Sequence, residues 1–451
     1  MKIEQALLLD RLGISQLNEM QMRMSEVIRH GNNVILLSPT GSGKTLAYML
    51  PLVSEIDETQ SALQVMVILP SRELAIQSEC VLREMKLNIR SLLLYGGRPM
   101  AGEIIRLREV RPHVVFATPG RLLDHLGNDS INVQSVNFLI VDEFDKCLEL
   151  GFEEDMRKIA KKLSEVRQCL LISATDGGEG ANFFDLLKSC RNRPIDKLDY
   201  RPFSRVGRAL AFAHKVPVYG SDRLETLSRL LSFLKGSSVI VFVAYRNSVD
   251  EVLAFLRKKG FSAVGYHGGM EQYLRERNLC KFRNESANVL VSTDLAARGL
   301  DIPNIKSVVH FHIPLTEDCF IHRSGRTARW TASGDVYILT GLRESIPEFV
   351  GEYDVVDING IEVHPCMPAW TTLYIAHDRR RKFSRGDVVG FLCKVGGLSL
   401  DKIGRIDVVE QGVYVAVLRT CLEEIIVKTS GQKMKGVKVR KVYWRHQLCE
   451  R

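Results

Sequence analysis

The sequence predicts an α/β protein with two parallel-sheet domains in series and a smaller third domain at the C-terminus. Three observations predict this class. Short runs of Val, Ile and Leu alternate with helical stretches, a polar stretch near residues 200–208 separates two sets of such runs, and the last part of the chain is strongly basic. A chain of 451 residues has room for about three domains. We expect the domains to span residues 1–203, 204–365 and 366–451.

The apolar runs give the expected strands of the two larger domains. The first set lies at residues 33–38, 64–70, 90–97, 113–119, 136–145 and 169–175, and the second at 237–245, 261–268, 287–294, 306–314 and 335–341. Their apolar residues run continuously instead of alternating, which is typical of parallel strands with helices on both faces. In such sheets, ligands bind at the carboxyl ends of the strands.

Composition indicates a soluble globular protein, with 45% hydrophobic and 25% charged residues. No apolar run reaches the roughly 18 residues of a membrane span, and the N-terminus has no export signal. No two of the ten cysteines lie within 20 residues of each other, which argues against a disulfide framework and a structural metal site. We therefore expect a cytoplasmic location, reduced thiols, and no membrane partner.

The positive charge of the chain is concentrated in its last segment. Residues 366–451 contain 17 Lys and Arg against 8 Asp and Glu, an excess of nine, which equals the net charge of the whole chain. A basic module on a neutral body predicts binding to a polyanion such as nucleic acid. A basic surface that is merely solvated is the alternative interpretation.

The same segment has the pattern of a small sheet domain. Strands are expected at residues 371–377, 404–410, 412–419 and 435–444, and helices at 385–396 and 421–428. This βαββαβ order is the topology of an RNA-recognition motif. Tyr374 and Tyr414 either stack on bases from the sheet or pack within it, and the sequence leaves both interpretations open.

A phosphate-binding loop is predicted by "SPTGSGKT" at residues 38–45, which follows an apolar strand and precedes a helix. Two glycines free the backbone N–H groups to face phosphates, Lys44 can reach the outer phosphates, and the Thr45 hydroxyl can bind Mg²⁺. The residues of this candidate cradle are Thr40, Gly41, Ser42, Gly43, Lys44 and Thr45. Alone, such a loop is a modest signal.

Two acidic residues end another apolar strand, and two arginines recur in the second domain. Asp142 can hold Mg²⁺, and Glu143 can orient and deprotonate a water molecule. Arg326 and Arg329, in "HRSGRTAR", suit the charge that develops on a transferring γ-phosphate. By itself, an arginine-rich helix is more often a solvated or ion-paired surface.

In this order, the motifs resemble those of the DEAD-box RNA helicases. They are "GISQLNEMQ" (Q motif), "SPTGSGKT" (I), "PSRELAIQ" (Ia), "GG" at 96–97, "TPGR" (Ib), "DEFD" (II), "SAT" (III), "VFV" (IV), "HGGMEQYLRER", "STDLAARGLDIP" (V) and "HRSGRTAR" (VI). The resemblance implies two tandem RecA-like domains that bind ATP and Mg²⁺. It also implies that ATP is hydrolysed only when the two domains close on RNA.

The resemblance assigns a role to each matching residue. Gln21 would read adenine, Gly299 and Asp301 would reach the ribose, and Arg326 and Arg329 would be arginine fingers. Residues that would couple hydrolysis to domain closure are Asp145, Ser173, Thr175 and His322. Residues that would grip the RNA sugar–phosphate chain are Arg72, Gly97, Thr118, Arg121, Arg275 and Thr293.

The C-terminal segment is similar to the RRM-like domain of the DbpA-like DEAD-box helicases. This implies an RNA partner, 23S ribosomal RNA in 50S assembly intermediates. The candidate contact residues are Arg379, Arg380, Arg381, Lys382, Arg385, Lys435 and Lys438, with Lys433 and Arg440 nearby. A general RNA chaperone that remodels messages, or an ATP-gated RNA clamp that scaffolds other proteins, are the alternatives.

The sequence also departs from the family pattern. Phe144 replaces the alanine of the DEAD box, and we expect it to be packed without loss of activity. The Q motif lacks its usual aromatic residue near Glu4, which predicts weaker adenine stacking. His312 stands where the family usually has Asp, and Trp330 where a small residue is common.

Overall fold

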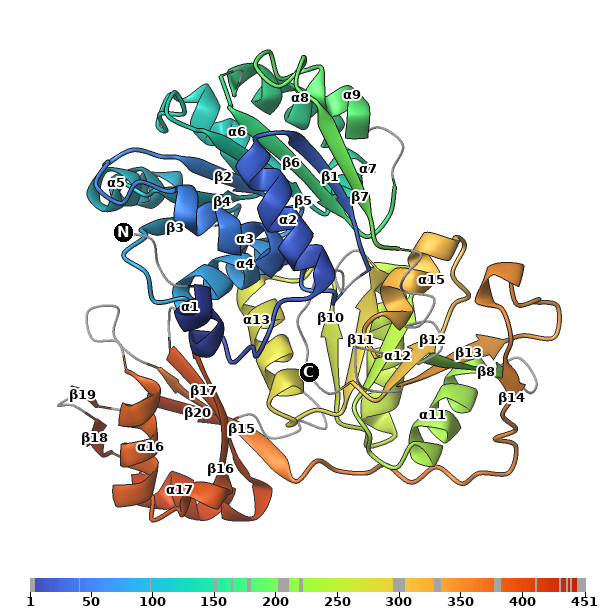
Figure 1. Cartoon of the computed structure of the whole chain (residues 1–451). Helices are drawn as coiled ribbons and strands as arrows, with labels where there is room; N and C mark the ends of the chain where they lie inside the picture. Colours follow the sequence, from blue (N-terminus) through green and yellow to red (C-terminus); the bar gives the residue numbers. More distant parts are fainter. Residues whose placement is uncertain are drawn as a thin grey trace. The chain divides into compact units, whose positions relative to one another are not determined.

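The computed structural model describes residues 5–39, 41–97, 99–149, 152–163, 165–176, 180–201, 211–218, 222–294, 305–327, 334–376, 383–409, 412–429, 431–434, 437–438 and 440–443. These residues belong to two compact units (Figure 1). The first extends to Arg201 and the second runs from Ala211 to Tyr443. Among the helices of the described ranges, none is long and apolar enough to cross a lipid bilayer.

The first unit is one parallel sheet with helices on both faces. Its elements are α1 (Gln5–Arg11), α2 (Glu19–His30), β1 (Asn33–Leu37), α3 (Lys44–Glu55), β2 (Val65–Ile68), α4 (Arg72–Glu84), β3 (Ser91–Leu94), α5 (Met100–Val110), β4 (Val114–Ala117), α6 (Pro119–Gly127), β5 (Phe138–Asp142), α7 (Phe144–Glu149), α8 (Glu153–Lys162), β6 (Gln168–Ser173), α9 (Gly180–Phe184) and β7 (Ile195–Asp199). The strand order is β3-β4-β2-β5-β6-β1-β7.

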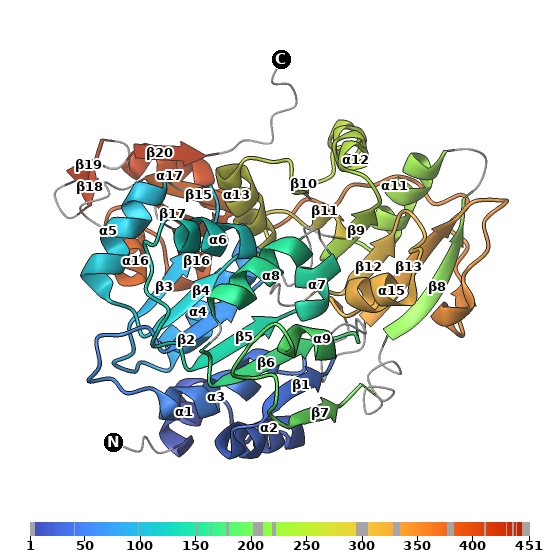
Figure 2. The ribbon, with the colours of Figure 1, turned by 90° about the horizontal axis from the view of Figure 1, so that it is seen from above.

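Two apolar cores cover the two faces of this sheet, because successive side chains of a strand point to opposite sides. Val34 and Leu36 of β1 pack with α2, α3 and α4, whereas Ile35 and Leu37 pack with α6, α7 and α8. Figure 2 shows α2 and α3 on one side of the sheet and α6 and α8 on the other. The continuous apolar runs of the sequence are thus explained by burial on both faces.

The second unit begins with another parallel sheet. Its elements are β8 (Ala211–Pro217), α11 (Arg223–Phe233), β9 (Val239–Val243), α12 (Arg246–Lys258), β10 (Ala263–Tyr266), α13 (Gln272–Arg283), β11 (Val289–Thr293), β12 (Ser307–His310), α15 (Glu317–Ser324), β13 (Gly334–Thr340), a short 3₁₀ turn (Glu348–Val350) and β14 (Asp354–Val355). The strand order is β10-β11-β9-β12-β13-β8-β14.

A four-stranded antiparallel sheet ends the second unit. Its elements are β15 (Trp370–Ala376), α16 (Arg385–Lys394), β16 (Ile403–Val409), β17 (Gly412–Leu418), α17 (Leu422–Thr429) and β20 (Arg440–Tyr443), in the sheet order β16-β17-β15-β20. Leu373, Val388, Leu392, Val415 and Ile425 form its core between the sheet and the two helices. The predicted α/β class, with two parallel-sheet domains and a βαββαβ domain, is confirmed.

Three strands of the structure were not predicted, and the extent of the last strand was predicted incorrectly. β7 reads IDKLD and lies at the sheet edge, β8 reads AFAHKVP, and β14 has only two residues, so none shows a continuous apolar run. The single last strand expected at 435–444 is wrong. β18 (Lys433–Met434) and β19 (Val437–Lys438) form a separate two-stranded hairpin, and only β20 joins the larger sheet.

Candidate nucleotide and RNA sites

The predicted phosphate loop connects β1 to α3 in the first unit. Gly41 and Gly43 both have φ of +83°, a left-handed conformation that glycine adopts without steric cost. Lys44 is the first residue of α3, and its buried Nζ donates a hydrogen bond to the Ser38 carbonyl at 3.0 Å. The loop therefore has the backbone conformation and the buried cation that phosphate binding requires.

The acidic pair lies beside this loop, because β5 and β1 both neighbour β6 in the sheet. Asp142 ends β5, and Glu143 follows it with φ of +52°, a strained conformation for a residue with a side chain. This turn brings Glu143 Oε1 to 3.5 Å from Lys44 Nζ. Both side chains are buried, so the lysine partly neutralises the carboxylate.

Asp142 has the environment of a cation ligand. Burial, with Glu143 as a second cause, raises its pKa to about 7. The Tyr48 hydroxyl donates a hydrogen bond to its Oδ2 at 3.1 Å. A buried acid beside another acid is the donor set that a divalent cation stabilises.

Gln21 packs directly against the phosphate loop. Its Nε2 donates to the Gly43 carbonyl at 3.4 Å, and its Oε1 accepts from the Asn18 N–H at 3.0 Å in a capping box that starts α2. A β-carbon on Gly43 would lie 2.5 Å from Gln21 Nε2. The loop and the Q motif therefore fit each other closely, while recognition of adenine by Gln21 remains a prediction.

The predicted coupling residues of the first unit also lie together. Thr175 Oγ1 donates to Asp145 Oδ2 at 2.5 Å, Thr175 N–H donates to Ser173 Oγ at 3.0 Å, and Lys146 pairs with Asp145 at 2.9 Å. Burial alone would raise the pKa of Asp145, but Lys146 and the hydroxyl donors leave it below its ordinary value. Phe144 is 1% exposed in the core of α7 and α8, as expected for a packed replacement of alanine.

The four predicted RNA residues of the first unit follow the strands of the other half of the sheet. Arg72 begins α4 after β2, Gly97 follows β3, and Thr118 and Arg121 begin α6 after β4. The Arg72 guanidinium lies against Gly97, because a β-carbon there would be 2.7 Å from Arg72 Nη1. Nucleotide and RNA candidates are therefore separated along one sheet edge, at β5-β6-β1 and β3-β4-β2 respectively.

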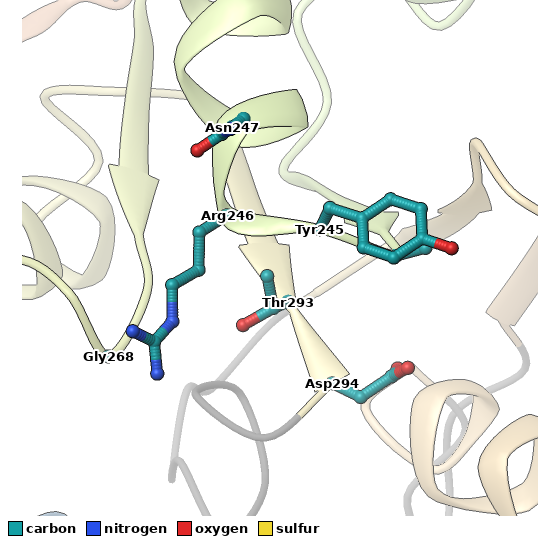
Figure 3. Close-up of a pocket in the computed structure, with 7 residues that line it drawn as sticks. Tyr245, Arg246, Asn247, Gly268, Thr293 and Asp294 are labelled. Carbon is teal, nitrogen blue, oxygen red and sulfur yellow. The ribbon is translucent and has the colours of Figure 1, made fainter.

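The second unit has a pocket of about 470 Å³ at the equivalent end of β9 and β11 (Figure 3). Its lining residues are Ala244, Tyr245, Arg246, Asn247, Gly268, Thr293 and Asp294. The N-terminus of α12 opens here without a side-chain cap, a backbone arrangement that favours an anion. Arg275 lies elsewhere on α13, with its guanidinium 5.0 Å from the Tyr266 ring centre.

Motif VI has a different geometry from the one considered in the sequence. Helix α15 ends at Ser324, so Arg326 lies beyond the helix, where its Nε donates to the His322 carbonyl at 3.3 Å. Arg326 and His322 are both buried. His312 Nδ1 accepts the Ala244 N–H at 3.1 Å, which gives this histidine a role in fixing the loop after β9.

The basic cluster of the C-terminal domain is only partly described. Arg385 and Lys433 are exposed, which suits contacts to phosphate. Tyr374 and Tyr414 face each other across β15 and β17 with ring centres 4.8 Å apart, but Tyr414 is only 8% exposed. Thr372 on the same sheet is hydrogen-bonded to Asn284, which follows α13, at 3.0 Å. This burial favours packing over base stacking for Tyr414.

For several residues that the sequence predicted as site residues, either the whole residue or its side chain lies outside the described part of the chain. They are Thr40, Gly299, Asp301, Arg329, Arg379, Arg380, Arg381, Lys382, Lys435 and, for its side chain, Lys438. Glu4 and Trp330 also lie outside the described residues. Their roles remain predictions.

Sequence reasoning missed three residues of these sites. Tyr48 contacts Asp142, Arg246 lines the pocket, and Arg323 forms the buried ion pair of motif VI with Asp294. Arg323 could have been found, because it lies in the same "HRSGR" as Arg326. Tyr48 gave no signal in the sequence, since its contact depends on how α3 packs beside β5.

Two RecA-like sheets, with a phosphate loop and an acidic pair meeting in the first, define a nucleotide-driven enzyme of the helicase class. Residues 18–181 match the DEAD/DEAH box helicase family, residues 222–331 the helicase conserved C-terminal domain, and residues 372–441 the DbpA RNA binding domain. In fold, the chain is similar to Dbp5 of S. cerevisiae bound to RNA and ADP BeF3, with a TM-score of 0.69 at 23% identity over 79% of this chain and 94% of that chain.

Relatives found by sequence share a higher identity with the chain than this structural neighbour does. The chain is 33% identical over 445 residues to the ATP-dependent RNA helicase DbpA of Escherichia coli K12, which covers 95% of this chain and 94% of that protein. It is 34% identical over 334 residues to the ATP-dependent rRNA helicase RRP3 of Coccidioides immitis, with 73% of this chain and 69% of that protein covered. The chain belongs to the DEAD-box ATP-dependent RNA helicases and carries a DbpA-type RNA-binding domain.

Proposed function

We propose that this RNA-dependent ATPase separates short RNA duplexes locally and is directed to 23S ribosomal RNA during 50S assembly. The observation that carries the proposal is that one edge of the sheet in the first unit holds two separate sets of candidate residues. Lys44, Asp142 and Glu143 gather at β5-β6-β1, and Arg72, Gly97 and Arg121 gather at β3-β4-β2. A rigid sheet between the two sets can make the occupancy of one affect the other.

In the proposed reaction, water attacks the γ-phosphorus of ATP and the bond to ADP breaks. Glu143 orients that water and accepts its proton, while Lys44 holds the phosphates and Arg326 supplies further positive charge. Thr45 and Asp142 would hold Mg²⁺, which would neutralise charge on the phosphates. Asp145 and Thr175, joined by a hydrogen bond, are suited to relay changes at the phosphates to the rest of the unit.

Support for the RNA target comes from the C-terminal domain. It matches the DbpA RNA binding domain, carries the whole net positive charge of the chain, and exposes Arg385 and Lys433. Backbone contacts of the two larger domains bind RNA without reading its sequence. Preference for a ribosomal element would then depend on this third domain.

The catalytic part is tested with Glu143→Gln, which keeps the size of the side chain but cannot accept a proton. We expect RNA-stimulated ATP turnover to fall at least about 100-fold while ATP and RNA binding persist. Glu154→Gln, an exposed acid on α8, is the matched control and should be unaffected. Normal turnover of Glu143→Gln would show that another group activates water.

The targeting part is tested by charge reversal, because removal of the whole domain would also uncover Asn284. ATPase stimulation by a 23S hairpin fragment, a generic hairpin and single-stranded DNA is compared for the wild type and for Arg385→Glu with Lys433→Glu. We expect the double variant to lose the preference for the 23S fragment and keep the generic response. Lys394→Glu with Lys258→Glu, two exposed lysines, is the control. A wild type without any preference would favour a general RNA chaperone.

Duplex separation is measured separately from ATP turnover. A labelled short duplex beside the 23S hairpin should be separated by the wild type with ATP, and not by Glu143→Gln over repeated turnovers. If the wild type hydrolyses ATP on this RNA yet separates no duplex, the ATP-gated clamp is the better description.

A further inference from the structure

A buried acid lies beside one of the RNA candidates of the first unit. Glu103 on α5 is 5% exposed, and its Oε2 accepts from His125 Nε2 at 2.9 Å. The same oxygen lies 3.3 Å from Arg121 Nε. His125 is fully buried and contacts Ser130 Oγ at 2.7 Å through Nδ1. The three side chains form a compact cluster between α5 and α6.

The cluster orients Arg121 rather than leaving it extended in solvent. The Arg121 side chain is only 10% exposed, its Nε also points to the Tyr95 carbonyl at 3.4 Å, and its Nη1 lies 3.7 Å from the exposed Asp124. Nε and Nη1 therefore both lie near oxygen atoms of the protein, which hold the side chain in one orientation. A guanidinium held in one orientation loses less entropy when it binds a phosphate bidentately.

Stability alone does not account for Glu103. Its other oxygen, Oε1, is buried and has no hydrogen-bond partner among the described residues. A buried carboxylate with an unsatisfied oxygen is costly, and apolar residues of similar volume often replace buried ion pairs without loss of stability. The acid is therefore better explained by what it does to Arg121.

We propose that Glu103, anchored by His125, is a positioning residue that holds Arg121 in the orientation in which it binds the RNA sugar–phosphate chain. The proposal rests on the proposed RNA-binding role of Arg121. It concerns RNA affinity, since the three side chains come from α5 and α6, which follow β3 and β4, whereas the nucleotide residues around Lys44 gather at β5-β6-β1. Loss of the carboxylate frees the guanidinium to sample other orientations and weakens RNA binding without altering the ATP site.

The test compares Glu103→Leu with Glu103→Gln in the full chain. Both variants remove the same charge and keep a similar volume, but only glutamine keeps an oxygen that can accept from Arg121 and His125. For Glu103→Leu we expect the RNA concentration for half-maximal ATPase to rise roughly 3- to 10-fold, with the rate at saturating RNA unchanged. For Glu103→Gln we expect a change of less than about twofold. Equal shifts in both variants would indicate a charge effect and overturn the proposal.

A double-mutant cycle with Arg121→Ala separates positioning from folding. In the Arg121→Ala background, Glu103→Leu should have no further effect on half-saturation; an undiminished effect would overturn the positioning role. If Arg121→Ala itself leaves RNA binding unchanged, the proposed function of Arg121 fails instead. Glu79→Leu, at another buried acid of this unit, should affect only the melting temperature. If Glu103→Leu does not fold, His125→Leu, which removes the anchor of the carboxylate, is used in the same cycle.

Discussion

Arg323 of motif VI is a buried cation of the second unit with several polar partners. It is 4% exposed, and its guanidinium makes a forked pair with Asp294, in which Nη2 donates to Oδ2 at 2.7 Å and Nε to Oδ1. Its Nη1 donates to the His312 carbonyl at 2.9 Å and to His310 Nδ1 at 3.2 Å. We predict that Arg323→Ala destabilises this unit more than it affects chemistry directly.

The magnitude follows from these contacts. Removal of one partner of a buried ion pair costs about 3–5 kcal/mol, because the remaining charge is left uncompensated. The Asp294 side chain keeps 28% exposure, so we expect the lower end, about 3 kcal/mol. For a unit of this size, that lowers the melting temperature by about 6–12 °C. Arg323→Lys should recover part of the loss, since an ammonium keeps the charge but cannot form the fork.

Tryptophan fluorescence is a selective assay for this prediction. All three tryptophans of the chain lie at or beyond residue 330, so their emission reports unfolding of the second unit, whereas far-UV circular dichroism reports the whole chain. Urea unfolding of Arg323→Ala is compared with that of Lys258→Ala, an exposed cation on α12. A loss below about 1 kcal/mol for Arg323→Ala would refute the reasoning, because the pair would then be replaceable by water.

Two further predictions concern other buried side chains. Phe144→Ala restores the usual alanine of the DEAD box but should destabilise the first unit by about 3–5 kcal/mol, because Phe144 is 1% exposed in a packed core. Chemical unfolding followed by circular dichroism measures the loss. A variant as stable as the wild type would contradict this prediction. Burial and Arg323 hold the pKa of His310 well below its ordinary 6.5, so below pH 6.5 the unfolded chain binds a proton that the folded chain does not. Between pH 6.5 and 5.5, stability should therefore fall by about 1 kcal/mol more in the wild type than in His310→Gln, because the unfolded histidine goes from half to almost fully protonated. Tryptophan-detected unfolding at the two pH values measures this, and an equal loss in both proteins would contradict it.

Local sequence patterns were enough to predict the class of the fold and the chemistry of its loops. Continuous apolar runs require burial on both faces, and the phosphate loop and the acids after "FLIV" are local patterns whose geometry depends on neighbouring residues. Polar edge strands such as β7 gave no such pattern, because one edge of an edge strand remains unpaired and its side chains need not be buried. The last strand was misjudged for a related reason, since a basic, apolar-poor stretch does not show where a hairpin ends.

Which distant residues contact one another could not be predicted from local patterns and depends on how the chain folds. The strand order places β6 between β1 and β5 and thereby brings Glu143 to 3.5 Å from Lys44. Packing of α5 against α6 pairs Glu103 with Arg121, and packing near Asn284 buries the sheet that carries Tyr414. Secondary structure follows from side chains a few residues apart, whereas strand order and the partner of a buried charge depend on contacts between distant segments, which periodicity along the chain does not encode.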